Sequence, residues 1–214
     1  MSRTAHKLMA SGAKEAYEID QSIMFNLADT SYLKRDYGSG ANSYTKWTFS
    51  TWFKNTSENY AGGSLWTSWD GSTQSDTSYG WIGVYQDKLQ IGGWSTNWRT
   101  TNRVFRDVGA WYHIVIASDT TQGTEANRLK MYVNGELAQS TSVLSHIAQN
   151  YNTGVNTGLQ HELGLFTSGG NPINVASEYI AETHLIMSTC GFSATGPPAV
   201  MAVFISSSYA LCMN

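Results

Sequence analysis

The sequence predicts an all-β protein in which two antiparallel sheets pack as a sandwich. Short runs of β-branched and aromatic residues recur at a spacing of about ten residues, with Gly, Asn, Asp and Ser between them. Within these runs apolar and polar residues alternate, as they do in strands with one buried face. No stretch keeps the period of about 3.6 residues for longer than one helical turn. A sandwich of 214 residues is expected to form a single domain.

The alternation predicts strands in the first half of the chain at 22–26, 31–35, 46–54, 64–67, 80–85 and 88–92. The third of these places Trp47, Phe49 and Phe53 on one face, which is typical of a central sandwich strand. Gln86-Asp87 has the two-residue spacing of a hairpin turn.

The second half of the chain contains the most strongly patterned stretch. The segment from Trp111 to Ala117 runs from aromatic into β-branched residues, as a buried strand does. After a polar loop, Arg128 to Val133 alternates and predicts the next strand. Asn134-Gly135 suits a type I′ turn, so the chain is expected to return antiparallel from Glu136 to Thr141. The last strands are expected at 162–166 and 178–186, with polar loops at 143–158 and 169–175.

The composition restricts the class of partner. Charged residues make up 14% of the chain, against roughly 25% in typical domains. The net charge is −3 and Lys and Arg form no run, which argues against nucleic acid and against anionic membranes, since both need a basic footprint. No segment approaches the roughly 20 apolar residues of a membrane span. A polar but nearly uncharged surface favours neutral, hydroxylated ligands.

Two sets of motifs resemble known proteins. The strand Trp-Tyr-His-Ile-Val from Trp111, an Asp-bearing loop, and Leu-x-Met-Tyr-Val-Asn-Gly ending at Gly135 resemble the signature of the laminin-G-like branch of the concanavalin A-like lectin/glucanase superfamily. This resemblance implies a jelly roll in which the strand and the hairpin are neighbours.

A narrower resemblance covers roughly residues 1–186. Motifs that occur in one order along the chain are similar to lectin-like structural proteins of marine tailed bacteriophages; they lie at 1–7, 31–33, 47–52, 104–107 and 179–184. The resemblance implies a virion protein made in the host cytoplasm, and the first residues contain no apolar signal for export.

The expected organisation has three parts. Residues 1–20 are an N-terminal arm that attaches to a particle or stays mobile, 21–186 form the sandwich, and 187–214 form an atypical tail. The tail departs from the family, and either a reading-frame change or a lineage-specific docking segment explains it. It contains Cys190 and Cys212, for which free thiols are favoured and a disulfide stays open.

Candidate catalytic residues are missing. Glucanases with this fold carry two Glu residues around a central Asp on one strand, as a retaining mechanism requires. The nearest match, Glu18-Ile19-Asp20, has no second Glu. We therefore expect no enzymatic activity.

A sugar site needs aromatic rings to stack on the C–H faces of a pyranose, with amides and carboxylates at their edge. The candidates are in two aromatic-rich loops: Trp94, Asn97, Trp98 and Arg99 in one, and Tyr60, Trp69 and Asp70 in the other. The alternative is that these Trp residues belong to the core, where we place Trp47, Trp81 and Trp111.

Calcium is the usual cofactor of laminin-G and lectin relatives, and the matching candidates are Asp119, Glu125 and Asn127. The alternative is that Asp119 only holds its own loop through backbone hydrogen bonds. His113 lies in a core strand, so we expect a buried imidazole bonded to backbone.

Taken together, the residues and the resemblance predict a non-enzymatic bacteriophage virion protein, either a decoration, a fibre or a tail-associated component. It would display a lectin-like domain that binds glycans on a host surface, contact other virion proteins through residues 1–20, and form a homo-oligomer. Three alternatives stay open: a purely structural virion subunit, a calcium-dependent glycan-binding module outside any virion, and a degraded glycoside hydrolase.

Overall fold

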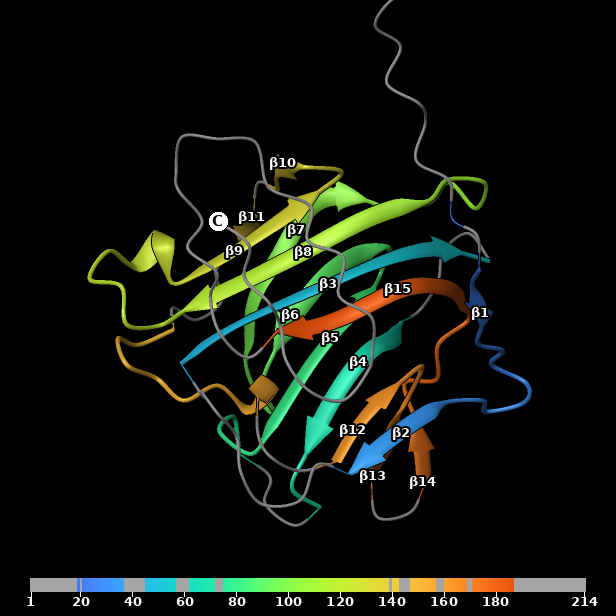
Figure 1. Ribbon diagram of the computed structural model, residues 1–214, viewed down its shortest axis with the longest axis horizontal. Coiled ribbons are helices and arrows are strands. Elements are labelled where there is room, and N and C mark those ends of the chain that lie inside the picture. Colours follow the sequence, from blue (N-terminus) through green and yellow to red (C-terminus); the bar gives the residue numbers. More distant parts are fainter. Residues whose placement is uncertain are drawn as a thin grey trace, which may run out of the picture.

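The computed structural model forms two antiparallel sheets that pack face to face (Figure 1). It describes residues 19, 21–36, 45–56, 62–71, 75–138, 140–142, 147–156, 160–168 and 171–186. The predicted all-β sandwich is therefore confirmed. Apart from Ile19, the predicted N-terminal arm lies outside the described residues, and so do the tail with Cys190 and Cys212 and the candidate Tyr60. Within the described segments, no helix is long and apolar enough to span a bilayer.

The first sheet has six strands in the order β1-β15-β3-β8-β9-β10. Their bounds are Ile23–Met24 for β1, Glu178–Ile186 for β15, Lys46–Asn55 for β3, Tyr112–Asp119 for β8, Leu129–Val133 for β9 and Glu136–Leu137 for β10. The long central strands β15, β3 and β8 are neighbours although they come from distant parts of the sequence, as expected for a jelly roll.

The second sheet has seven strands in the order β11-β7-β6-β5-β4-β12-β2. Their bounds are Ser140–Ser142 for β11, Asn97–Val104 for β7, Lys88–Gly92 for β6, Tyr79–Tyr85 for β5, Gly63–Trp69 for β4, Gln160–Leu163 for β12 and Leu33–Asp36 for β2. A separate hairpin pairs β13 (Phe166–Ser168) with β14 (Asn171–Ile173), and the 3-10 turns are η1 (Glu125–Asn127) and η2 (Gly154–Asn156).

Both predicted two-residue turns are confirmed. Asn134 and Gly135 have φ angles of 52° and 82°, which join β9 to β10. Gln86 and Asp87 have φ angles of 49° and 60° between β5 and β6. Positive φ at both central positions matches the right-handed twist of the flanking strands.

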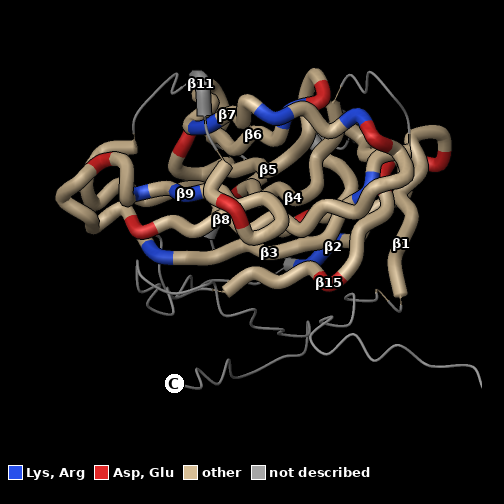
Figure 2. The backbone as a smooth tube through the Cα atoms, turned by 90° about the horizontal axis from the view of Figure 1, so that it is seen from above, with Lys and Arg blue, Asp and Glu red and all other residues tan. Residues whose placement is uncertain are grey.

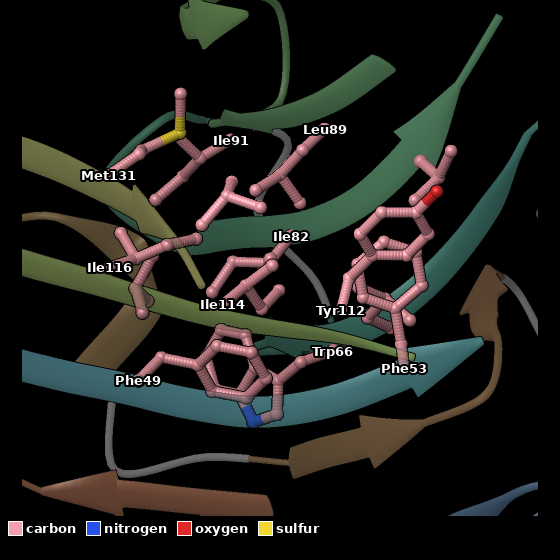
Figure 3. Packing of buried hydrophobic residues seen from close by; sticks show 14 of the residues in the cluster. Phe49, Phe53, Trp66, Ile82, Leu89, Ile91, Tyr112, Ile114, Ile116 and Met131 are labelled. Carbon is pink, nitrogen blue, oxygen red and sulfur yellow. The ribbon is translucent and has the colours of Figure 1, made fainter. Parts of the chain in front are cut away.

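The core lies between the sheets, where apolar side chains of both layers interdigitate (Figure 3). Its fully buried members include Trp47, Phe49 and Phe53 of β3 and Ile114 of β8. Burying a side chain of this size contributes about 1.5–3 kcal/mol. The sequence prediction for these β3 residues is therefore confirmed.

The buried indole of Trp47 depends on one polar partner. Its Nε1 donates a hydrogen bond of 2.7 Å to Oγ1 of the buried Thr153. Replacing Thr153 with valine keeps the shape but leaves this donor unpaired, so we expect a loss of about 1–3 kcal/mol in the free energy of unfolding. Urea denaturation measures it, and an unchanged midpoint would show that the bond contributes nothing.

Several local predictions are wrong. Trp94 to Arg99 was expected to be loop, but β7 begins at Asn97. The predicted return strand to Thr141 is divided, because β10 pairs with β9 whereas β11 pairs with β7 in the other sheet. The loop expected at 169–175 contains β14.

Three core assignments are also wrong, because these side chains lie on outer faces of the sheets. Trp81 and Trp111 are only partly buried. His113 is partly buried too, and its Nε2 lies 3.0 Å from Oγ of Ser50 rather than against backbone. Its ring packs on Trp52 at a centroid distance of 4.8 Å. Side chains alternate across a strand, so the neighbours Ile82 and Ile114 take the core positions instead.

Candidate functional site

A cavity of about 490 Å³ opens on the face of the seven-stranded sheet that points away from the core. Ile82, Leu89 and Ile91 point into the core, so Trp81 and Gln90 on the same strands point the other way. The volume falls in the range of small-molecule sites. The cavity is lined by Gly62, Gly63, Tyr79, Trp81, Val84, Tyr85, Gln90, Gly93, Trp94, Ser95, Thr96, Asn97, Phe166 and Asn174.

One wall of the cavity is a cluster of aromatic rings that support one another. Tyr79 meets Trp94 edge to face at 5.4 Å between centroids, with 83° between the planes. Phe166 of the β13–β14 hairpin lies 4.7 Å from Tyr79 and 6.2 Å from Trp94. Such pairs contribute about 0.5–1.5 kcal/mol each beyond burial, so this wall is held in place without a ligand.

Trp81 lies along the surface of the sheet. A Cβ built on Gly83 would be 2.9 Å from Cζ3 of its indole, and one on Gly92 would be 3.0 Å from its Nε1. Gly83 is two residues along β5, and Gly92 is the cross-strand partner of Trp81 on β6. Because opposite ends of the ring contact these two glycines, the indole lies flat over the sheet and presents a face to the cavity.

Tyr85 is held in a similar way at the end of β5. A Cβ on Gly62 would come within 2.6 Å of its ring. Tyr85 is nevertheless 47% exposed. Trp81 and Tyr85 therefore provide two open aromatic surfaces beside the wall of Tyr79, Trp94 and Phe166.

The polar groups of the cavity are neutral. Gln90 of β6, Asn97 of β7 and Asn174 before β15 provide amides, each of which has both donors and an acceptor. Ser95 and Thr96 add hydroxyls. In the part of the lining that the structure describes there is no Asp, Glu, His, Lys or Arg.

The loop that carries Trp94 is fixed by backbone hydrogen bonds. The amide of Gly93 donates to the carbonyl of Thr96 at 2.8 Å, which closes a tight turn. The amide of Ser95 donates to Oδ1 of Asp76, also at 2.8 Å. A Cβ on Gly93 would lie 2.6 Å from that same Oδ1, so only glycine lets Asp76 approach so closely.

The hydroxyl of Tyr79 keeps its proton. Burial raises its pKa well above the ordinary value, and the charge of Glu162 adds to the effect. The phenol is therefore neutral throughout the physiological range, and it is a hydrogen-bond donor.

The structure divides the predicted sugar site. Trp94 and Asn97 line the cavity. Trp98 does not: it is 3% exposed in the core, and its ring lies 6.3 Å from that of Tyr151, so its expected exposure is wrong. Arg99 is partly buried on β7 outside the lining, and burial lowers its pKa.

The two other described candidates, Trp69 and Asp70, are not in the lining of the cavity. Trp69 meets Phe166 edge to face at 5.6 Å between ring centroids. The amide of Asp70 bonds to the carbonyl of Ser78.

Sequence reasoning missed two aromatic residues of the lining, Trp81 and Tyr85. The signal that was available is their pairing with glycines. In Gly80-Trp81-Ile82-Gly83, a glycine two residues after an outward aromatic leaves room for the ring to lie on the sheet.

Among the proposed calcium ligands, the carboxylate of Asp119 already has hydrogen-bond and ion-pair partners. Oδ1 of Asp119 accepts from the amide and hydroxyl of Thr121, and Oδ2 accepts from Gln122 and lies 3.5 Å from Nζ of Lys46. Burial acts to raise the pKa of Asp119, but these hydrogen bonds and Lys46 outweigh it and hold the pKa below its usual value. Glu125 and Asn127 lie on η1. Among the described residues, no group of three or more His, Cys, Asp or Glu side chains could hold a metal ion.

The fold and the cavity define a lectin-like β-sandwich. A family model described as the concanavalin A-like lectin/glucanases superfamily matches residues 28–169. The chain belongs to this superfamily, which confirms the broader of the two resemblances. No curated protein matches the chain in sequence.

Solved structures share the architecture at low sequence identity. Domains LG4-5 of the mouse laminin α1 chain match 76% of this chain at 13% identity, with a TM-score of 0.52, and this chain covers 40% of them. A variant of the NanB sialidase from Streptococcus pneumoniae matches 79% at 18% identity, with a TM-score of 0.56, and 26% of it is covered.

The CBM40 module of the Ruminococcus gnavus IT-sialidase, bound to α2,3-sialyllactose, matches 83% of the chain at 15% identity, with a TM-score of 0.52. In this case 92% of the solved chain is covered. At these identities the likeness establishes the fold alone.

Proposed function

We propose that this protein is a non-enzymatic glycan-binding module and that the cavity on the seven-stranded sheet is its site. One observation carries the proposal: Trp81 and Tyr85 are laid on the sheet by glycines, so that their rings line a preformed cavity edged with amides. Flat aromatic surfaces stack on the apolar faces of pyranose rings, while amides pair with their hydroxyls. The R. gnavus module with bound sialyllactose is an example of a glycan held by this architecture.

Each part of the lining has a role in this proposal. Trp81 and Tyr85 would stack on sugar rings, and the wall around Trp94 would bound the site on one side. Gln90, Asn97 and Asn174 would fix the orientation of the sugar through its hydroxyls. Because the aromatic wall is already packed, little conformational entropy is lost on binding.

The absence of catalysis belongs to the proposal as well. Glycoside hydrolysis uses a pair of carboxyl groups about 5–5.5 or 6.5–9.5 Å apart across the scissile bond. The nearby acids are engaged otherwise: Asp76 holds the amide of Ser95, and Oε1 of the buried Glu162 accepts from Gln160. Neither of them lines the described part of the cavity.

The test of the site is the replacement of Tyr85 with alanine. Loss of one open stacking surface is expected to weaken glycan binding by about 1–2 kcal/mol, or roughly five- to thirtyfold in Kd. Isothermal titration or a glycan array measures the effect. Tyr32, which is 44% exposed and lies away from the cavity, provides the matched control, since Tyr32→Ala should bind as the unaltered protein does. If both variants lost glycan affinity equally, or if neither lost any, the result would argue against the site.

The finer proposal is that the module is displayed on a bacteriophage particle, with residues 1–20 as the attachment and a homo-oligomer as its state. It is supported by the ordered motifs that resemble lectin-like phage structural proteins. Mass spectrometry of purified particles from an infected host tests it. Detection of the chain only in the lysate would contradict a virion location and leave the glycan site unaffected.

A further inference from the structure

We propose that the cavity selects uncharged saccharides and discriminates against acidic ones such as uronic and sialic acids. The inference rests on the proposed glycan-binding function and adds the class of sugar. It is carried by the charges in and around the cavity: a lining of neutral groups, from which the neighbouring cations Lys88 and Arg99 are absent, and one carboxylate at the rim.

Recognition of an acidic sugar requires a cation or several directed donors for its carboxylate. Arg provides a planar fork for this purpose and Lys a point charge. The described lining offers amides, hydroxyls and aromatic rings only. A carboxylate that leaves water for such a site loses hydration without gaining a charged partner.

The rest of the chain has few cations to add. The loops between strands that lie outside the described residues contain no Lys or Arg in their sequences, at 37–44, 57–61, 72–74, 143–146, 157–159 and 169–170. The cations of the described part are spread over the tube in Figure 2 rather than gathered on one face.

Several of these cations are held by other contacts. Nε of Arg106 lies 2.7 Å from Oδ2 of Asp87. Arg128 donates to the carbonyls of Gln122, Gly123 and Ile147. Lys54 lies over the rings of Trp111 and Tyr179 on the other sheet. The cations on the strands that form the cavity are Lys88 of β6, which is the cross-strand partner of Tyr85, and Arg99 and Arg103 of β7. The guanidinium of Arg103 lies over the ring of Tyr112.

The charge at the rim is negative. Oδ1 of Asp76 accepts from the amide of Ser95 at 2.8 Å and lies 3.5 Å from its hydroxyl, and Ser95 lines the cavity. Within the described segments Asp76 forms no ion pair. No cation of the described segments therefore pairs with its charge, and a like charge on the ligand is repelled.

The experiment compares sugars that differ in charge alone. Cello-oligosaccharides and manno-oligosaccharides are titrated beside the same oligosaccharides oxidised to carboxylates at C6, at low and at physiological salt. For each oligosaccharide that binds, the neutral form is expected to bind at least about tenfold more tightly than its oxidised form. This difference in affinity should shrink as salt screens the charge of Asp76. Equal or tighter binding of the oxidised member would overturn the inference while leaving glycan binding intact.

Two variants make the test specific. Asp76→Asn keeps an acceptor for the amide of Ser95 and removes the charge, so the affinity ratio of neutral to oxidised sugars should fall several-fold. Lys88→Gln should leave the preference unchanged. An unchanged ratio in Asp76→Asn, with neutral binding retained, would refute the role of the rim charge. Failure of the unaltered protein to bind any sugar on a broad panel of neutral and acidic glycans would instead refute the glycan site itself.

Discussion

Replacing Trp81 with alanine is expected to abolish detectable glycan binding while the protein stays folded. The indole lies flat over Gly83 and Gly92 at the centre of the sheet, so its removal takes away the ring surface on which a sugar is proposed to stack. Anchoring aromatics of this kind typically account for 2 kcal/mol or more of binding free energy, so a loss of at least about thirtyfold in Kd follows. Sugar-binding modules are commonly weak, and a loss of that size would take the interaction out of the measurable range.

The variant needs a control for removing a tryptophan from an outer face. Trp111 is suitable, because it is also partly buried but lies against Lys54 and Tyr179 on the other sheet. Trp111→Ala should bind glycans normally. Both variants should unfold cooperatively in urea, since neither residue belongs to the core cluster. Normal binding by a folded Trp81→Ala protein would rule out the cavity as the glycan site.

The fold could be predicted because its decisive residues lie close together in sequence. Asn134-Gly135 sets its own turn geometry, and the alternation around Phe49 and Phe53 separates a buried face from an outer one without any tertiary information. These signals are local in sequence, and the tertiary structure adds only the pairing of the strands. The predicted strand boundaries are wrong where tertiary contacts determine which sheet a strand joins. An example is Ser140, where the chain passes to the other sheet.

Strand β7 was missed because its alternation is interrupted. The register between β6 and β7 shifts twice, between Lys88 and Gln90 and again between Ile91 and Gly92. A bulge places an extra residue on one strand, so the period of two that identifies a strand is lost. Within β7 the ordinary alternation places Trp98 in the core while its neighbour Asn97 lines the cavity.

The site was only partly predictable, since it is assembled from three distant segments. Trp81 and Tyr85 come from β5, Trp94 from the loop before β7, and Phe166 from the β13–β14 hairpin. Local aromatic density indicated Trp94 as a candidate for sugar binding, and Trp94 lines the cavity. The same reasoning assigned Trp81 to the core. The space for the indole on the outer face depends on Gly92, and only the strand register places Gly92 opposite Trp81. No sequence pattern connects Phe166 to Trp94 before the hairpin is placed.

The second large effect concerns stability rather than binding. Glu178 at the start of β15 is completely buried, and neither carboxyl oxygen has a hydrogen-bond partner among the described residues. Burial raises its pKa from an ordinary 4.5 to about 8. The folded protein therefore holds a proton on this group over a range in which the unfolded chain has released it.

The sign of the pH dependence follows from this difference. Between pH 4.5 and about 8 the folded state binds more protons than the unfolded state, so the free energy of unfolding falls as pH rises through that window. At neutral pH, keeping the carboxyl protonated costs about 3 kcal/mol relative to the unfolded chain. Burial lowers the pKa values of His113 and His184, which contribute in the opposite sense, so the effect of Glu178 must be taken from a comparison of variants.

Glu178→Gln is expected to raise the free energy of unfolding by up to about 3 kcal/mol near pH 7, and to have little effect near pH 4, because glutamine has nearly the same shape but no charge to neutralise. Urea denaturation at several pH values measures both quantities. Glu136→Gln, which makes the same chemical change on exposed β10, should stay within about 0.5 kcal/mol of the unaltered protein at every pH. If the stability gained by Glu178→Gln did not grow with pH, the carboxyl would be ionised in the folded protein, and a buried partner would have to compensate its charge.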